Sequence, residues 1–222
     1  MNVKPLNIAD KKEDDNKLLK IALVLSIITI LYNIAEGLIS IFFGLSDETL
    51  ALLGFGVDSF VEVISGMAIL HLVLRMRYEK VLNRDSFERF ALKITGFSFY
   101  LLTAGLIVGA SLNIYFGSVP ETTIPAVIIS VISIATMYFL MTAKLKTGKK
   151  LKSDAIIADA NCTKTCFYLS LILLSSALLY ELFKVGYFDI AGSLGIAWFA
   201  FKEGREAFEK SKSGKLACSC ED

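Results

Sequence analysis

The sequence has almost no net charge, a single histidine and no polar stretch that we expect to form a soluble domain. Its 222 residues carry 23 basic and 22 acidic side chains, which gives a formal net charge of +1. This balance argues against nucleic acid as a partner. The first seventeen residues lack the basic start and short apolar core of a cleavable signal peptide, and the polar ends are too small to bury a core.

Apolar residues dominate the chain instead. They make up 55% of the sequence, and the mean hydropathy is +0.60, as in integral membrane proteins. Most of the apolar runs are long enough for the roughly 20 residues that a spanning helix requires. The runs are 21–45, 50–74, 94–116, 124–143, 155–183 and 188–201, the last continuing as a helical pattern to Ala207. The sequence therefore predicts an all-α membrane protein with six transmembrane helices. The expected division is a cytoplasmic N-terminal arm (1–17), one transport domain (18–208) and a cytoplasmic tail (209–222).

The positions of the basic residues predict the orientation of these helices. All of the 23 basic residues except Lys164 and Lys184 lie before the first run, after the second or fourth run, or after the sixth run. The positive-inside rule then places both termini in the cytoplasm. We expect a multi-pass protein of the cell membrane, either a plasma or an inner membrane.

Two pairs of residues in the apolar runs suggest a metal site. Asp58 and Glu62 are four residues apart, and so are Cys162 and Cys166. At this spacing the side chains of a pair share one helix face, with Cβ atoms about 5–6 Å apart. A carboxylate near the bilayer centre costs roughly 2.5–3.5 kcal/mol, so two of them need compensation. If the two helices face each other, two carboxylates and two thiolates supply four ligands for a divalent metal.

Each pair also has a plainer interpretation. Lys164 could neutralise the two carboxylates, or extend to the cytoplasmic interface instead. The cysteines could be small packing residues. A disulfide between them fits less well, because it needs Cβ atoms about 3.5–4.5 Å apart.

Other polar residues have less specific expectations. Asn33 and Glu36 of the first run could hydrogen-bond between helices or line an ion pathway. Asp159, three residues before Cys162, could widen a cytoplasmic vestibule or pair locally. His71 is expected to be an interfacial polar residue and is left out of the site.

Small residues and a second cysteine pair complete the motifs. Glycines and an alanine at four-residue spacing predict that the third and sixth helices pack closely; they are Gly105 and Gly109 in one, and Ala191, Gly192 and Gly195 in the other. Cys218 and Cys220 near the end of the chain suggest capture of soft metals at the inner mouth, or an incidental pair.

Several stretches resemble the cation diffusion facilitators. Residues 33–38 and 50–63 resemble the first two helices of that family, residues 153–166 the start of the fifth, and residues 189–208 the sixth. The resemblance implies a homodimeric metal–proton antiporter of six helices, with a transport site made by two residues of helix two and two of helix five. On this chain these are Asp58, Glu62, Cys162 and Cys166.

The chain departs from the family's usual pattern. The family usually has aspartate where Glu62 stands, and histidine or aspartate followed by aspartate where the two cysteines stand. A histidine-rich cytoplasmic loop and a ferredoxin-like C-terminal domain are also missing, which indicates a short member of the family.

These features predict a secondary transporter that exports a soft or borderline divalent cation, such as Zn²⁺ or Cd²⁺, rather than Mn²⁺ or Mg²⁺. Because thiolates must lose their protons to bind metal, we expect exchange for protons. We expect no enzymatic activity and no resident cofactor; the partners are the metal cation, protons, the lipid bilayer and a second copy of the chain. The alternatives are a non-transporting scaffold or regulator, in which Lys164 neutralises the carboxylates, and a membrane thiol oxidoreductase that uses Cys162 and Cys166.

Overall fold

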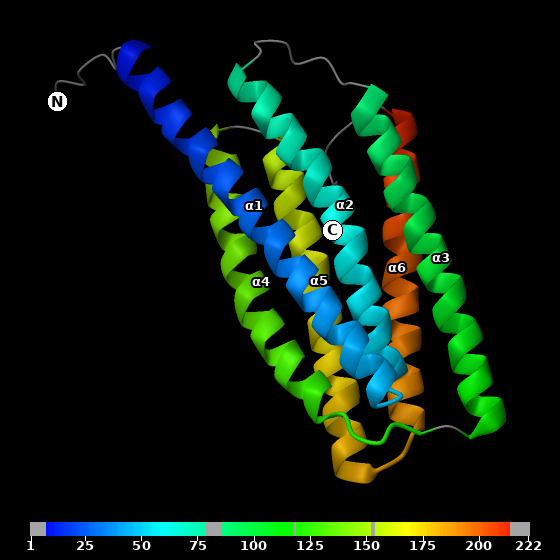
Figure 1. The fold of residues 1–222 in the computed structure, drawn as a ribbon. Helices are drawn as coiled ribbons and strands as arrows, with labels where there is room; N and C mark the ends of the chain where they lie inside the picture. The colour runs from blue at the N-terminus through cyan, green and yellow to red at the C-terminus, as the bar shows by residue number, and fades with distance from the viewer. Residues whose placement is uncertain (1–7, 79–85, 118, 152–153, 214–222) are drawn as a thin grey trace.

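A computed structural model describes residues 8–78, 86–117, 119–151 and 154–213. These residues form a bundle of six helices joined by short connections (Figure 1). The helices are α1 (Ile8–Ser46), α2 (Leu50–Tyr78), α3 (Ser86–Phe116), α4 (Ile124–Leu151), α5 (Asp154–Phe183) and α6 (Tyr187–Ser213). The predicted all-α architecture with six helices is confirmed.

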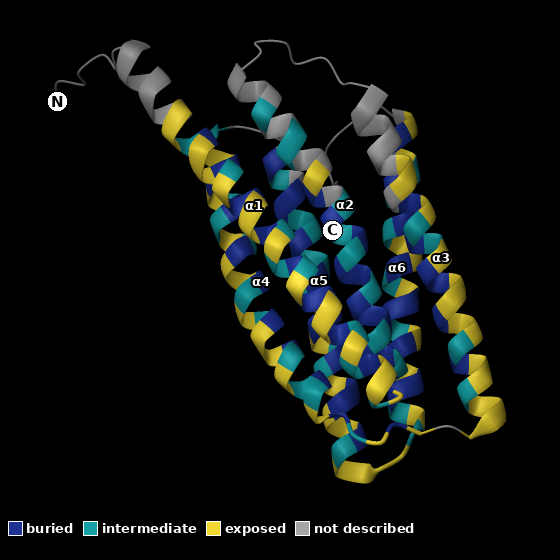
Figure 2. Ribbon diagram, in the orientation of Figure 1, coloured by how far each residue is buried: buried dark blue, intermediate teal, exposed yellow. Residues whose placement is uncertain are grey.

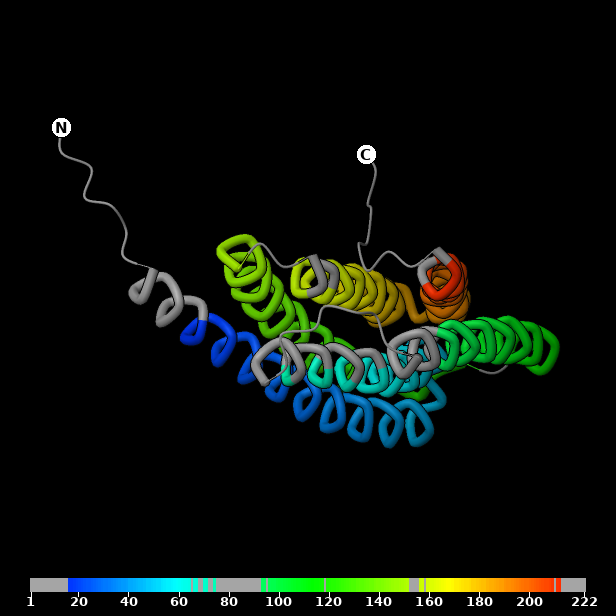
Figure 3. The backbone as a smooth tube through the Cα atoms, turned by 90° about the horizontal axis from the view of Figure 1, so that it is seen from above, coloured from blue at the N-terminus to red at the C-terminus, as the bar shows by residue number. Residues whose placement is uncertain are grey.

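The helices pack mainly as three pairs. The most extensive contacts are between α1 and α2, between α4 and α5, and between α3 and α6. In addition, α2 packs against α3, α5 and α6, so it lies at the centre of the bundle, and Figure 3 shows the same arrangement from above. The core where these pairs meet contains Leu52, Phe55, Leu169, Leu173 and Ile196.

The outer surface of the bundle is apolar. Exposed residues follow the outer faces of α1, α3 and α4 (Figure 2), and they include Leu31, Phe42, Phe97 and Phe139. Four helical segments among the described residues are long and apolar enough to cross a membrane: Asn16–Ser46, Gly96–Phe116, Ile124–Leu151 and Asp159–Phe183. Besides the apolar core, the buried positions carry serine, threonine and carboxylate side chains, so these polar groups face inward while the outer surface is apolar.

The helices extend beyond the apolar runs. α1 begins at Ile8, inside the segment expected as an arm, and α6 continues to Ser213, inside the expected tail. Likewise α4 runs to Leu151, so Lys144 and Lys146 lie in a helix and not in a loop. Lysine and glutamate are good helix formers, so the end of an apolar run does not mark the end of a helix.

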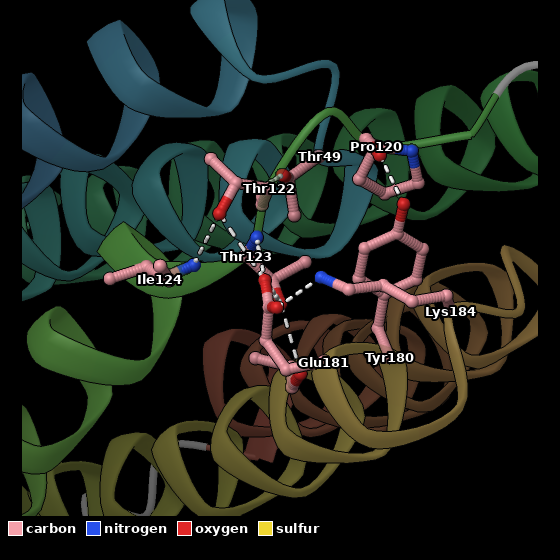
Figure 4. A network of polar contacts seen from close by, with 9 residues as sticks. Thr49, Pro120, Thr122, Thr123, Ile124, Tyr180, Glu181 and Lys184 are labelled. Atoms are coloured by element: carbon pink, nitrogen blue, oxygen red, sulfur yellow. Dashed lines mark hydrogen bonds and ion pairs between the residues drawn. The ribbon is translucent and has the colours of Figure 1, made fainter.

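One end of the bundle is fastened by hydrogen bonds between its connections. We call it the hairpin end, because the α1–α2, α3–α4 and α5–α6 connections all lie there; the opposite end, where α1 begins and α6 ends, is the terminal end. Figure 4 shows part of the network: the Thr49 hydroxyl donates to the Thr122 carbonyl at 3.3 Å, and the Thr123 amide donates to Glu181 at 2.7 Å. The Tyr180 hydroxyl donates to the Pro120 carbonyl.

Asp189, in the first turn of α6, caps the first turn of α2. Its carboxylate accepts the backbone N–H of Leu50 at 2.9 Å and that of Ala51 at 3.2 Å. The first amides of a helix have no partner within the helix, and a carboxylate is a favourable acceptor for them. This cap fixes the start of the helix that carries Asp58 and Glu62.

The prediction that α3 and α6 pack together is confirmed, but the residues proposed for the contact are wrong. A Cβ added at Gly105 would meet nothing within 4 Å, and one at Gly109 would meet Leu50 of α2. The close approach is made by Gly96 and Gly204, where a Cβ on either glycine would lie within about 3.2 Å of the other's carbonyl oxygen.

The small residues proposed for α6 contact other helices. A Cβ at Gly192 would collide with Ser176 of α5, and one at Gly195 would approach Ile172 of the same helix. Ala191 is exposed. The spacing correctly indicated a close helix contact at Gly109, Gly192 and Gly195, but spacing alone does not identify the partner helix.

Candidate metal site

The central helix α2 and its neighbour α5 bring the predicted site residues to the interior of the bundle. Asp58 and Cys166 are 2% and 3% exposed, whereas Glu62 and Cys162 are half-buried. Glu62 lies about 18 Å along the helix from the start of α2, near the middle of a bilayer core about 30 Å thick. A carboxylate at this depth needs specific partners.

Glu62 has such partners on both sides. The Cys166 thiol of α5 donates a hydrogen bond to Glu62 Oε1. On the other side, Asn33 Nδ2 of α1 donates to Glu62 Oε2 at 2.9 Å. One residue of each predicted pair is therefore in direct contact across the α2–α5 interface.

Asp58 lies one turn from Glu62 and is not satisfied in the same way. Its Oδ1 atom is buried and has no hydrogen-bond partner in the structure. The carboxylate interacts electrostatically with Glu62, Glu203 and Glu36. A buried carboxylate oxygen without a donor, among other acidic groups, is an energetically unfavourable arrangement that a bound cation would relieve.

Cys162 lies one helical turn from Cys166, and neither of these two cysteines forms a disulfide. The Cys166 Sγ atom also contacts the Cys162 carbonyl oxygen at 3.6 Å. Within the described residues, no three histidine, cysteine, aspartate or glutamate side chains are grouped as a metal coordination shell. The structure thus joins Glu62 to Cys166 and places Asp58 within electrostatic range of both, while the four-ligand site as a whole stays a prediction.

Asn33 and Glu36 of α1 make helix-to-helix hydrogen bonds, the plainer of the two roles expected for them. Besides the bond from Asn33 to Glu62, the Ser59 hydroxyl of α2 donates to Glu36 Oε2 at 3.1 Å. The Tyr32 hydroxyl donates to Glu36 Oε1 at 2.9 Å. The bonds to Glu62 and from Ser59 fix α1 against the turn of α2 that contains Asp58, whereas the Tyr32 bond lies within α1.

Lys144 is the residue next to the site that the sequence analysis missed. Its side chain is 2% exposed, forms an ion pair with Asp159 at 3.0 Å and donates to the Thr163 hydroxyl at 3.1 Å. Hydropathy placed it in a loop because charged residues are frequent from this point on. The periodicity of α4 was a usable signal, since Met137, Leu140 and Lys144 lie on one buried stripe at helical spacing.

The remaining polar residues are placed as follows. Lys164 lies over the ring of Tyr168 at 5.7 Å, and the lysine that interacts electrostatically with Glu62 is Lys144. Asp159 was expected either to widen a vestibule or to pair locally; it forms an ion pair, but its partner is Lys144 of α4. Glu203 of α6, which the sequence analysis did not single out, accepts a hydrogen bond from Thr165 at 3.0 Å. His71 is half-buried on α2, outside the predicted site. Cys218 and Cys220 lie outside the described residues.

A bundle with apolar outer faces and carboxylates and thiols in its interior defines an integral membrane domain suited to cation passage. The comparison with protein families matches residues 23–213 to the cation efflux transmembrane domain. The chain belongs to this family, whose members are membrane-embedded transporters of metal cations and not enzymes. No curated protein matches the chain in sequence.

Proposed function

We propose that the protein exports a soft or borderline divalent metal cation, such as Zn²⁺ or Cd²⁺, in exchange for protons. The proposed ligands are Asp58, Glu62, Cys162 and Cys166. One observation carries the proposal: the Cys166 thiol contacts Glu62 across the α2–α5 interface, beside the buried and unpartnered Oδ1 of Asp58. The proposal includes a homodimer in the cell membrane with cytoplasmic termini, supported by the family resemblance and the distribution of basic residues.

The ligand types support a soft cargo. Two thiolates favour Zn²⁺, Cd²⁺ and softer ions over Mn²⁺ and Mg²⁺, which prefer sites made only of oxygen. The Cys166 thiol donates its proton in a hydrogen bond to Glu62. A metal ion that binds both groups displaces this proton, and departure of the metal lets the proton return. Metal and protons therefore compete for the same atoms, which is the basis of antiport.

The packing of the helices supports a movement that exposes the site to each side in turn. Glu62 belongs to the closely packed α1–α2 pair and Cys166 to the closely packed α4–α5 pair. Rocking of one pair against the other would open and close the site without breaking either pair. The ligands of α2 and α5 would separate and rejoin in this movement.

Transport in proteoliposomes with an internal pH dye tests the proposal. Wild-type protein is given a panel of Zn²⁺, Cd²⁺, Mn²⁺ and Mg²⁺, with Asp58→Ala and Cys162→Ala beside it. We expect Zn²⁺- or Cd²⁺-driven proton movement in the wild type and its loss in both variants, which should still insert. Glu48→Gln and Ser175→Ala change exposed residues outside the site and serve as matched controls. Normal flux in both site variants would reject this ligand set.

The same preparation separates the two alternatives. If the purified wild type binds no metal and moves no protons, the scaffold or regulator becomes the better explanation. If mild oxidation forms a disulfide between Cys162 and Cys166 that turns over with a thiol substrate, the membrane thiol oxidoreductase becomes the better explanation. Mass spectrometry of the peptide that contains both cysteines measures that disulfide directly.

A further inference from the structure

The bundle contains a buried cation that the proposed transport site does not use. Lys144 is 2% exposed, and its ammonium group is held by Asp159 at 3.0 Å and by Thr163 at 3.1 Å. A charged lysine in such a position is costly unless it is paired, so this arrangement is a specific one. Lys144 comes from α4, whereas both of its partners come from α5.

The partners of Lys144 belong to the part of α5 that carries the thiols. Asp159 precedes Cys162 by three residues, and Thr163 follows it directly. The Thr163 hydroxyl also donates to the Asp159 carbonyl at 3.1 Å, so the two partners are linked to each other. One ammonium group therefore fixes the turn of α5 on which Cys162 stands.

The opposite side of the same turn is held by α6. Thr165 donates to Glu203 at 3.0 Å, so the segment from Asp159 to Cys166 is fixed between α4 and α6. Rotation of α5 by a fraction of a turn would move Cys166 away from Glu62 and turn Cys162 with it, because the two cysteines share one face. The contacts of Lys144 oppose this rotation.

The charge of Lys144 is also directed away from the ligand atoms. Its ammonium group interacts electrostatically with Glu62, yet its hydrogen bond and its ion pair go to Thr163 and Asp159. Because Lys144 pairs with Asp159, it leaves the Glu62 carboxylate available to a metal ion. Without Asp159, the lysine would be free to compete with the metal for the carboxylates.

We propose that Lys144 is a positioning residue of the metal site: through Asp159 and Thr163 it holds the turn of α5 in the rotation that directs both thiolates toward Glu62. This inference rests on the proposed function, because it assigns Lys144 a role in building that site. It predicts that loss of the Lys144 contacts weakens binding of the metal by the thiolates more than it weakens folding of the bundle.

The test measures the thiolate-to-metal charge-transfer absorption and the affinity of bound Cd²⁺ in purified full-length protein. The main variant is Lys144→Met/Asp159→Leu, which removes both charges together and leaves no buried charge unpaired. We expect Cd²⁺ affinity to fall about tenfold or more, as when a group that orients a ligand is lost, with a weaker charge-transfer band. The single variant Lys144→Arg, which can keep the ion pair, should retain the wild-type Cd²⁺ affinity and charge-transfer absorption. Circular dichroism and size-exclusion chromatography report on the fold.

Each outcome decides the question. A folded double variant with wild-type affinity and absorption overturns the inference. If the double variant does not fold, Thr163→Val decides: it removes only a hydroxyl that Lys144 contacts, and an unchanged charge-transfer band again overturns the inference. A wild type that binds no Cd²⁺ refutes the proposed function itself. If the wild type binds Cd²⁺ and Cys162→Ser and Cys166→Ser weaken the band while the Lys144 variants do not, only this inference fails.

Discussion

Replacing Asp189 by alanine should destabilise the bundle measurably, because this carboxylate accepts hydrogen bonds from two backbone amides at the start of α2. Asp189 is 1% exposed and accepts the N–H groups of Leu50 and Ala51. A hydrogen bond to a charged group contributes about 1.5–3 kcal/mol, and loss of an N-cap costs about 0.5–2 kcal/mol, so we expect a loss of about 3 kcal/mol. At about 2–4 °C per kcal/mol for a chain of this length, the apparent Tm should fall by about 6–12 °C.

Thermal unfolding in detergent, followed by fluorescence-detected size-exclusion chromatography, measures this change. Asp189→Asn retains one side-chain oxygen as an acceptor and should fall between the wild type and Asp189→Ala. Glu48→Gln, at an exposed position in the α1–α2 connection, is the control and should leave the Tm unchanged. A Tm for Asp189→Ala within about 1 °C of the wild type would show that the carboxylate does not act as the cap of α2.

Three further predictions concern the ligands and the helix contacts. Cys162→His/Cys166→Asp, which introduces the family's usual ligands, should shift the relative affinity from Cd²⁺ toward Zn²⁺; competition between the two ions measures it, and an unchanged ratio would count against thiolate ligation. Zn²⁺ binding in weakly buffered solution should release protons, and Glu62→Gln should release fewer; equal release would argue that Glu62 does not exchange its proton for metal. Gly96→Ala should cost about 1–3 kcal/mol, because its Cβ would lie 2.8 Å from Phe208, whereas Gly105→Ala should stabilise by about 0.5–1 kcal/mol. Equal Tm values for these two glycine variants would refute the assigned α3–α6 contact.

Much of the fold could be predicted from the sequence, because apolar runs of spanning length determine the number and order of the helices. The ends of the helices could not be predicted in this way, since hydropathy falls where lysine and glutamate begin, and these residues continue a helix readily. Lys144 shows the consequence. Hydropathy assigned it to a loop, whereas the helical stripe it shares with Met137 and Leu140 continues into the buried interior.

The candidate site could be predicted in part. Spacing placed Asp58 with Glu62 and Cys162 with Cys166, and the contact between Glu62 and Cys166 agrees with two pairs that face each other. Spacing gave no information on Lys144 or Glu203, because each acts through a helix other than its own. The glycine patterns failed for a similar reason: Gly109 and Gly192 do lie at close approaches, but only the three-dimensional packing says which helix approaches, and a Cβ at Gly105 would meet nothing within 4 Å.

The hydrogen bonds at the hairpin end have a consequence for movement. There, Thr49 is joined to the α3–α4 connection, Thr123 to Glu181 of α5, and Asp189 of α6 to the first turn of α2. The bonds of Thr49 and Asp189 join different helix pairs and would have to break if the pairs separated at this end, whereas the Thr123–Glu181 bond lies within the α4–α5 pair. We therefore expect opening toward the terminal end to pivot with the hairpin end as the fulcrum, and opening toward the hairpin end to require that the bonds between pairs break. Under this geometry a small tilt at the fulcrum gives a wide opening at the terminal end.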